Sequence, residues 1–338
     1  MTDLSAPISM ADVTAARVRL APYLTPTPTR TYATLDQEIG AGIQVFVKHD
    51  NHLPTNAFKA RNAMSFMTTL APTQRAAGVV AATRGNHGMG LAWAGQQLGI
   101  PVTICVPHGN NPEKNAAIRG YGATLVEAGD DYDAAVQVAA ALVAERGMTL
   151  AHSTNNAMII AGAATLTAEI CEQVPAFDAI VLAIGGGSQA VGALVVLQAL
   201  RPNVKVYGVQ AAGAPAAHDS WHAQQRLVSA SAVTIADGLA TRSTYDMTWP
   251  ALAAGLAGFV TVTEAQLAEA VRSTWRTTHN LVEPAGAAGL AGVGVLREKL
   301  AGQRVVVVCC GANIDAATLA MIAAGPEMER TSERSERG

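Results

Sequence analysis

Apolar residues along this chain recur at two different spacings. Short runs that are rich in valine, isoleucine and alanine, as buried strands are, occur at residues 43–48, 79–82, 101–106, 123–126, 179–184, 204–209 and 305–308. Longer segments, whose apolar positions repeat every three to four residues as in a helix, occur at residues 9–20, 89–98, 113–120, 133–146, 156–172, 190–200, 264–278 and 315–324. Because strands and helices follow each other in turn, we predict an α/β fold with parallel-rich open sheets flanked by helices.

The alternation falls into two blocks. Residues 75–150 hold a βαβαβα run of their own, so we expect them to form a small, mobile domain. Residues 1–74 and 151–325 are expected to fold together as a large domain. Residues 326–338 are charged and poor in apolar side chains, which predicts a disordered tail. Two structured domains are in keeping with a length of 338 residues.

Composition narrows the class of protein. Half of the residues are hydrophobic and 14% are charged, which is typical of a compact globular protein. A net charge of −3 gives no electrostatic basis for binding nucleic acid or an anionic membrane. The four cysteines show no CxxC spacing, so buried thiols in a reducing compartment explain them better than disulfides or zinc. Because the amino terminus lacks a signal-peptide pattern, we expect a cytoplasmic protein.

Lys59 is the first candidate for chemistry. It follows a turn-forming stretch that contains Pro54 and Asn56 and opens an apolar segment, so it is expected in the first turn of a helix. The partial positive charge of a helix amino end, together with burial, lowers the pKa of a lysine and yields the free amine that a Schiff base needs. Taken alone, such a lysine is more often an ordinary exposed side chain.

A glycine loop lies between a predicted strand and a predicted helix. Gly185, Gly186 and Gly187 are followed there by Ser188 and Gln189. Successive backbone N–H groups at the start of a helix form a cradle for a phosphate. The spacing also fits a dinucleotide fingerprint, but no carboxylate stands about 20 residues later, where the ribose partner belongs. The phosphate cradle is therefore favoured over a nicotinamide site, and over glycines that only turn a tight corner.

Two further strand ends carry small polar or thiol side chains. Residues 83–87 form a strand-to-helix turn that suits a carboxylate, although a simple capped turn is as common. Residues 309–313 end a valine-rich strand, at the edge where ligands of open α/β sheets bind. We expect Cys309 to pack in the core and Cys310 to point the opposite way.

The chain thus carries a lysine at a helix start, a glycine loop and a small polar group at a strand end. In this order and spacing, these three features resemble the fold-type II pyridoxal-phosphate enzymes, and among them the serine/threonine dehydratase and serine racemase family. The family's lysine motif appears at residues 55–63, its Ser-x-Gly-Asn-His motif at residues 83–87 and its glycine loop at residues 185–189. Further matches lie at residues 236–240, 282–288 and 310–313. The resemblance implies a two-domain fold like that of the tryptophan synthase β subunit, with pyridoxal 5'-phosphate as the cofactor of the large domain.

The resemblance also implies two sets of site residues. The cofactor-binding set would be Phe58, Lys59, Asn86, Gly185, Gly186, Gly187, Ser188, Gln189 and Cys310. The substrate-binding set would be Thr83, Arg84, Gly85, Asn86 and His87. Lys59 would be the catalytic residue, because in this family the lysine holds the cofactor as a Schiff base and its freed amine moves the α-proton of the substrate.

Single residues gain roles from the same resemblance. Phe58 would pack against the pyridine ring, and Asn86 would hydrogen-bond the ring hydroxyl. Cys310 would face the ring nitrogen, and such a neutral partner leaves the nitrogen largely unprotonated, which suits β-elimination. Residues 185–189 would hold the phosphate, and the turn at residues 83–87 would bind the substrate carboxylate.

Several positions depart from the family pattern, among them Ser188 and Gln189 at the end of the glycine loop. Asn56 and Asn62 replace glycines, which a left-handed backbone would allow. Arg84 replaces the serine that serves racemases as the second acid/base, and a guanidinium is not a base at neutral pH, which speaks against racemisation. Gln210 replaces a glutamate of the family's divalent-cation site, so we expect no metal.

The resemblance therefore predicts a pyridoxal-phosphate dependent lyase, an ammonia-lyase or dehydratase, that acts on a β-hydroxy-α-amino acid.

 The expected reaction is dehydration and deamination, with L-threonine or L-serine as the default substrate and a 2-oxo acid and ammonia as products. One alternative is a dehydratase for 3-hydroxyaspartate, phenylserine or a hydroxyectoine-derived amino acid. An amino-acid racemase is a second alternative, with less support. We expect a homodimer.

Two functions of other classes are disfavoured. A nicotinamide-dependent oxidoreductase would leave Lys59 without a function and would lack the carboxylate that Gln210 replaces. A non-catalytic pyridoxal-phosphate binding protein would not need the lysine, Asn86 and the glycine loop together.

Overall fold

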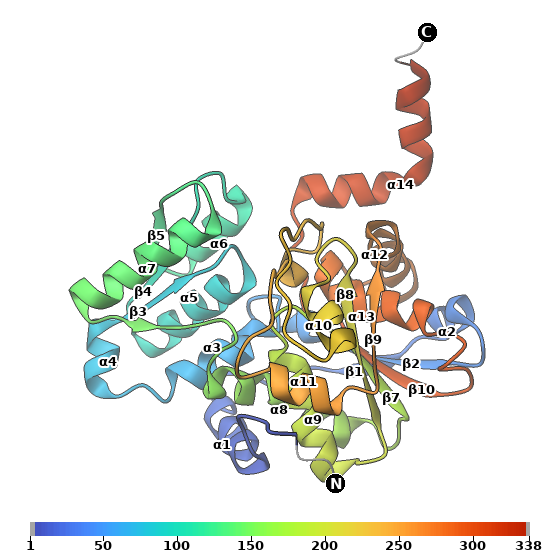
Figure 1. The fold of residues 1–338 in the computed structure, drawn as a ribbon, viewed down its shortest axis with the longest axis horizontal. Coiled ribbons are helices and arrows are strands. Elements are labelled where there is room, and N and C mark those ends of the chain that lie inside the picture. The colour runs from blue at the N-terminus through green and yellow to red at the C-terminus, as the bar shows by residue number, and fades with distance from the viewer. Residues whose placement is uncertain (1–3, 336–338) are drawn as a thin grey trace.

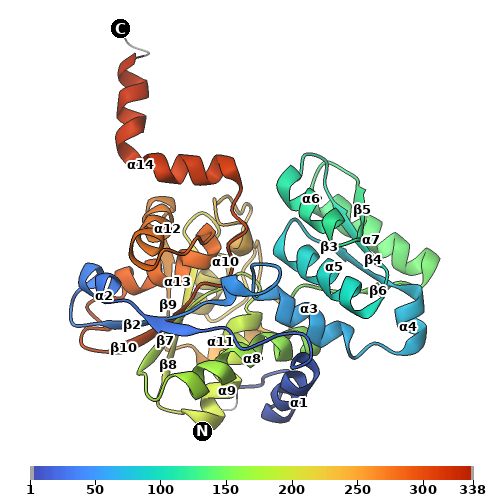
Figure 2. The ribbon, with the colours of Figure 1, turned by 180° about the vertical axis from the view of Figure 1, so that it is seen from behind.

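The computed structural model describes the backbone of residues 4–335 and the side chains of residues 4–325. Its strands form two open sheets, which lie side by side in both views (Figure 1, Figure 2). In spatial order, the larger sheet consists of β1 (Thr29–Thr31), β2 (Gln44–Lys48), β10 (Arg304–Val308), β7 (Ala179–Ala183), β8 (Lys205–Ala211) and β9 (Gly258–Val262). The smaller sheet consists of β5 (Thr124–Glu127), β4 (Val102–Val106), β3 (Val79–Ala82) and β6 (Thr149–Leu150). Neighbouring strands are parallel except β1 and β2, which confirms the predicted α/β fold with parallel-rich sheets.

Helices cover both faces of the larger sheet. One face carries α1 (Met10–Leu20), α8 (Ala157–Gln173) and α9 (Ser188–Leu200), and the other carries α2 (Ala33–Ile39), α12 (Glu264–Thr278) and α13 (Pro284–Val295). In β10, Val306 and Val308 belong to the hydrophobic cluster of the first face, whereas Val305 and Val307 belong to that of the second. Because successive side chains of a strand point to opposite faces, this run of valines is buried only when both faces are covered.

The smaller sheet is built in the same way. Helices α5 (Asn86–Leu98) and α6 (Pro112–Gly120) pack on one face, and α7 (Tyr132–Arg146) packs on the other. Val79 and Ala81 of β3 join the first cluster, and Val80 joins the second. All strands of this sheet lie within residues 75–150, and the boundaries of the two expected domains stay a prediction.

Helix α3 (Lys59–Met67) connects the two halves of the molecule. It packs against α5 on the side of the smaller sheet and against α8 on the side of the larger sheet. Its apolar residues join the same hydrophobic cluster as β3 and α5. The candidate lysine therefore begins the helix that lies between the two sheets.

Several elements were not predicted from the sequence. These are β1, β6, β9, α2, α13, α4 (Pro72–Ala77), α10 (Ala216–Ala223), α11 (Trp249–Gly255) and the short 3-10 turns η1 (Asp50–His52) and η2 (Asp237–Leu239). Most are too short to show a periodic pattern. The predicted strands and helices are all present, with ends that differ by a few residues.

The carboxyl end differs from the expectation. Helix α14 (Ala316–Ser335) breaks at Gly325, where φ is 68°, and its second half leads away from the two sheets (Figure 1). The backbone of residues 326–335 is thus helical where we expected a disordered tail over residues 326–338, and residues 336–338 lie outside the described part. Among the described residues, no helix has both the length and the apolar character needed to cross a membrane.

Candidate active site

Lys59 is the first residue of α3, where the sequence places it. Within the described chain, the first turn of α3 has no acidic residue and its amino end has no side-chain cap, so the partial positive charge of the helix end acts on the ammonium group. Burial lowers the pKa of Lys59 to about 8. Its Nζ lies 4.8 Å from the centre of the Phe58 ring. At neutral pH, Lys59 therefore holds more free amine than an exposed lysine does.

The two asparagines beside this lysine behave differently. Asn56 has a φ of 52°, so the left-handed backbone expected at this position is confirmed. Asn62 is instead a buried residue inside α3, three positions after Lys59, and residues three apart share one face of a helix. Its Nδ2 donates to Oγ of Ser188 at 3.4 Å. The left-handed backbone considered for Asn62 is therefore not present, and its contact with Ser188 could not be read from the sequence, because the two residues lie far apart along the chain.

The turn before Lys59 is fixed to the end of β10. The backbone N–H of Phe58 donates to the carbonyl oxygen of Cys310 at 2.9 Å. Cys309 and Cys310 belong to the hydrophobic clusters of opposite sheet faces, which confirms their predicted orientations. Burial raises the pKa of Cys310, so its thiol is neutral, and Sγ lies 3.6 Å from the carbonyl oxygen of Ala285.

A buried cluster of four charged side chains anchors α3 two residues after the lysine. The guanidinium of Arg61 donates to both carboxylate oxygens of Asp50, at 2.8 and 3.0 Å, and to both of Glu169, at 2.5 and 2.8 Å. Lys48 donates to Glu169 at 2.6 Å. None of these side chains is more than 9% exposed. Because the four residues come from α3, η1, α8 and β2, their ion pairs hold the start of α3 against the larger sheet.

The glycine loop connects β7 to α9 under tight packing. Gly187 has a φ of 91°, a conformation that other residues rarely adopt. A side chain at Gly185 would collide with the backbone of Gly238, and one at Gly186 would collide with Thr154. These glycines are therefore required by the protein itself, before any ligand is considered.

The same loop also offers donors to an anion. Within the described chain, no side chain caps the amino end of α9, and the first N–H groups of a helix have no partners inside it. Nε2 of Gln189 is buried and has no hydrogen-bond partner among the described residues. A phosphate bound here would accept these N–H groups. The loop and the amine of Lys59 thus fit the two ends of the expected cofactor.

The turn at residues 83–87 lies at the amino end of α5. The helix begins at Asn86, three residues earlier than the sequence suggested, so Asn86 and His87 occupy its first turn. Gly85 precedes them as the cap residue, and Thr83 is tied to the smaller sheet by its N–H, which donates to the carbonyl oxygen of Cys105 at 3.2 Å. Backbone N–H groups in a first turn are suited to a carboxylate, as predicted for this turn.

The ring of His87 cannot provide such a donor. Burial lowers the pKa of His87 to about 3, so the imidazole is neutral and carries a single N–H. Nε2 lies 2.9 Å from the carbonyl oxygen of Ala151, which uses that N–H. Nδ1 is buried without a hydrogen-bond partner among the described residues. A substrate carboxylate could therefore bind the backbone N–H of His87, but not its ring.

Arg84 lies at the exposed side of the turn. Among the described residues it makes no ion pair. Burial raises the pKa of Tyr132, whereas the nearby charge of Arg84 acts to lower it, so the two side chains are neighbours. Tyr245 in turn meets the ring of His152 edge-on, with the ring centres 5.3 Å apart. Tyr245 also acts on the pKa of Tyr132, so the loop that carries Tyr245 reaches this region.

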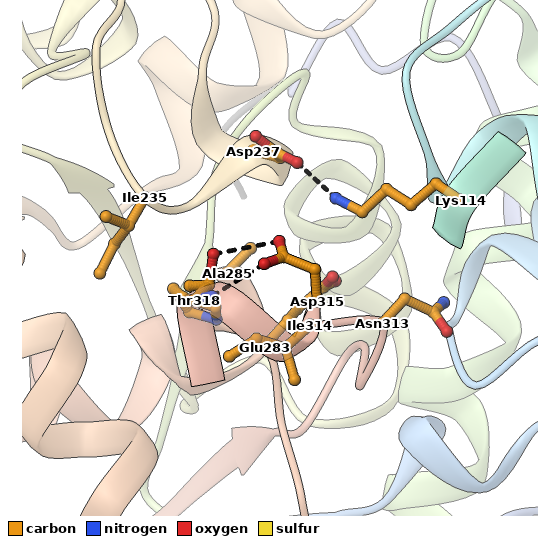
Figure 3. Close-up of a pocket in the computed structure, with 10 residues that line it drawn as sticks. Lys114, Ile235, Asp237, Glu283, Ala285, Asn313, Ile314, Asp315 and Thr318 are labelled. Carbon is orange, nitrogen blue, oxygen red and sulfur yellow. Dashed lines mark hydrogen bonds and ion pairs between the residues drawn. The ribbon is translucent and has the colours of Figure 1, made fainter. Parts of the chain in front are cut away.

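A cavity of about 120 Å³ lies beside the turn (Figure 3). Lys114 of α6 points across it and forms an ion pair with Asp237 of η2. Glu283 and Asn313, which both hydrogen-bond Asn86, lie in its wall. The cavity is therefore bounded by α6 from the side of the smaller sheet and by segments from the side of the larger sheet.

Gln210, the residue that replaces a glutamate of the family's cation site, lies near the end of β8. Its Oε1 accepts hydrogen bonds from the backbone N–H groups of Ala217 and His218, both at 3.0 Å, and its Nε2 donates to Oγ1 of Thr241 at 3.4 Å. Both ends of the amide are thus used within the fold. Among the described residues, no group of three or more His, Cys, Asp and Glu side chains is arranged to hold a metal ion.

Comparison with known proteins identifies the relatives of this chain. The model of a family described as "Pyridoxal-phosphate dependent enzyme" matches residues 20–311. An L-threo-3-hydroxyaspartate ammonia-lyase of Pseudomonas sp. is 34% identical over 91% of this chain and 96% of the relative. An L-threonine ammonia-lyase of Geobacter sulfurreducens is 34% identical over 83% of this chain and 70% of the relative. The structure of maize serine racemase superimposes with a TM-score of 0.88 at 27% identity, covering 97% of this chain and 99% of that one.

Proposed function

Because the chain belongs to the family of pyridoxal-phosphate dependent enzymes, we propose that it dehydrates and deaminates a β-hydroxy-α-amino acid to a 2-oxo acid and ammonia. The observation that carries the proposal is the buried amine of Lys59, whose pKa is lowered to about 8, at the end of a helix between two sheets. The similarity to two ammonia-lyases supports the reaction class. L-threonine and L-serine are the substrates we propose first.

Bound pyridoxal phosphate supplies an electron sink for the negative charge that develops at the α-carbon. We assign its phosphate to the backbone of residues 185–189, with Gln189 and Asn62 close by. Phe58 would pack against the ring, Asn86 would donate to the ring hydroxyl, and the neutral thiol of Cys310 would face the ring nitrogen.

The chain's own groups then divide the work on the substrate. The backbone N–H groups of residues 85–87 bind the carboxylate and so orient the α-hydrogen. The amine of Lys59 removes that proton and holds it at Nζ. The β-hydroxyl takes up a proton as its bond to the β-carbon breaks and leaves as water, so that one proton and one hydroxyl are lost in total. Hydrolysis of the resulting enamine releases ammonia and the 2-oxo acid. Arg84 stands where a racemase needs a second acid/base, and its guanidinium does not supply one.

An assay of 2-oxo acid formation tests the proposal. The purified enzyme would be supplied with L-threonine, L-serine, L-threo-3-hydroxyaspartate and phenylserine. We expect product from at least one of them, and none from a Lys59→Ala variant that keeps the circular dichroism spectrum of the wild type. Product formation by the variant at the wild-type rate would refute the role of Lys59, and fast interconversion of L- and D-serine would favour a racemase instead.

We further propose that the protein is a cytoplasmic homodimer. The four cysteines are free and buried, which suits a reducing compartment. Three large apolar side chains on or just after α12 and on α14 are exposed: Trp275 of α12 (53%), Leu281 in the segment after α12 (38%) and Met321 of α14 (54%). Because α14 packs against α12, these side chains form an apolar surface that a second copy of the chain could cover.

A further inference from the structure

The side-chain amide of Asn86 is held at both ends. Its Nδ2 donates to Oε1 of Glu283 at 2.5 Å, and its Oδ1 accepts a hydrogen bond from Nδ2 of Asn313 at 2.7 Å. Asn86 begins α5 beside the smaller sheet, whereas Glu283 precedes α13 and Asn313 follows β10 of the larger sheet. The two contacts therefore join the substrate-binding turn to the part of the molecule that carries Lys59.

The chemistry of the two partners allows the amide of Asn86 only one orientation. Nδ2 of Asn313 also donates to the carbonyl oxygen of Thr55 at 2.9 Å, and a carbonyl oxygen can only accept. Asn313 thus presents N–H groups to Asn86, and the carboxylate of Glu283 presents an acceptor. Because an amide nitrogen has two hydrogens, one N–H of Asn86 is committed to Glu283 and a second one is left for a ligand.

Glu283 and Asn86 meet at a position where the backbone approaches both closely. A side chain at position 311 would collide with the carboxylate of Glu283 and would come within 3.1 Å of Nδ2 of Asn86, so Gly311 makes their contact possible. Glu283 is only 7% exposed, and Figure 3 shows it in the wall of the cavity below Lys114 and Asp237. Burial raises the pKa of Glu283, while the charge of Lys114 and the hydrogen bond from Asn86 act to lower it.

We propose that Glu283 and Asn313 are positioning residues that fix the amide of Asn86 so that its second N–H is offered to the ring hydroxyl of the cofactor. The proposal rests on the proposed role of Asn86 as the partner of that hydroxyl. It adds that this role depends on two residues that come from the side of the larger sheet and do not need to touch the cofactor themselves.

Binding of pyridoxal phosphate to the apoprotein tests the proposal without any substrate. The readouts are the dissociation constant of the cofactor and the visible absorption spectrum of the bound form, which responds to a hydrogen bond at the ring hydroxyl. Asn313→Asp replaces the donor by an acceptor that faces Oδ1 of Asn86, so we expect at least a roughly 10-fold weaker affinity and a changed spectrum. Glu283→Gln keeps an acceptor of the same shape without the charge, so we expect changes of the same kind but smaller, both in the affinity and in the spectrum.

Asn51→Asp is the matched control. Asn51 is also buried, and its Nδ2 donates to the carbonyl oxygen of Leu281, two residues before Glu283. Asn51 makes no hydrogen bond to Asn86 among the described residues. We expect this variant to keep the wild-type spectrum and affinity, and Asn86→Ala to show the largest change of all. If Asn86→Ala changes both readouts while Asn313→Asp and Glu283→Gln change neither, the positioning role is wrong and the role of Asn86 stands. If Asn86→Ala changes nothing, the role of Asn86 itself is wrong, and the positioning role falls with it.

Discussion

At the scale of single residues, the charge state of Lys59 decides whether the site can work. Burial lowers its pKa to about 8, so the protonated amine is disfavoured in the folded chain and the proton is lost as the pH rises through that value. Roughly a tenth of the side chains are then free amines at pH 7, far more than for a lysine in water.

This pKa makes a prediction for the apoprotein. Attachment of pyridoxal phosphate to Lys59, trapped by borohydride and measured by mass spectrometry, should become faster as the pH rises from 6 to 9, with a midpoint near 8. The Lys59→Ala variant should show no attachment at that peptide. A midpoint near the ordinary lysine value would mean that burial does not act on this amine.

Arg84 carries the second prediction at this scale. If its exposed guanidinium pairs with an anionic group on the substrate side chain, Arg84→Ser should lower kcat/KM for 3-hydroxyaspartate by roughly 10-fold or more, the equivalent of about 1.4 kcal/mol. The value for L-threonine, which has no such group, serves as the control. If Arg84 points to solvent, both values should barely move, and racemase activity should be looked for, because the racemases that the chain resembles carry a serine acid/base at this position.

Sequence motifs predicted which residues to examine, because Lys59, the turn at residues 83–87 and the glycine loop each follow a recognisable local pattern. They did not predict the partners. Asn62 contacts Ser188, and Glu283 contacts Asn86, across more than a hundred residues of chain. Such contacts depend on how the sheets and helices pack, which no local pattern records.

At the scale of elements, α13 shows why a buried helix escaped prediction. Its glycines resemble loop signals in the sequence. In the structure, Gly286, Gly289 and Gly292 are spaced three apart and so share one face, where side chains would collide with Gly311, with the carbonyl oxygen of Val181 and with Val209. The glycines allow α13 to lie close against the larger sheet, a requirement that comes from packing and overrides helix propensity.

Helix α3 provides a test of how the site is anchored. Arg61→Met would leave the buried carboxylates of Asp50 and Glu169 with only Lys48 to balance them, so we expect a loss of about 3–5 kcal/mol in the free energy of unfolding. Urea denaturation measures this.

The matched control is Arg17→Met, which breaks the exposed ion pair of Arg17 with Glu172 and should cost less than about 1 kcal/mol. Equal losses for the two variants would show that the buried cluster contributes no more than a surface ion pair does.

At the scale of the whole molecule, the alternation of strands and helices predicted two structural units, and the two sheets correspond to them. What the pattern did not show is that α3 packs against both units. Every residue of α3 after Lys59 is buried, polar ones such as Arg61, Asn62 and Ser65 included, so the polar positions of its sequence do not mark a solvent-facing side. The position of the lysine between two sheets follows from this packing.

The proposed homodimer gives the last prediction. If a second copy covers the apolar surface of α12 and α14, Trp275→Glu should place a charge in that interface, and the mass measured by light scattering should fall from that of a dimer to that of a monomer. Val18→Glu is the control, because Val18 is also an exposed apolar helix residue. It belongs to α1, which lies far from α12 in both views (Figure 1, Figure 2). A wild-type monomer would contradict the dimer, and a dimer that survives Trp275→Glu but not Val18→Glu would move the interface to the side of α1.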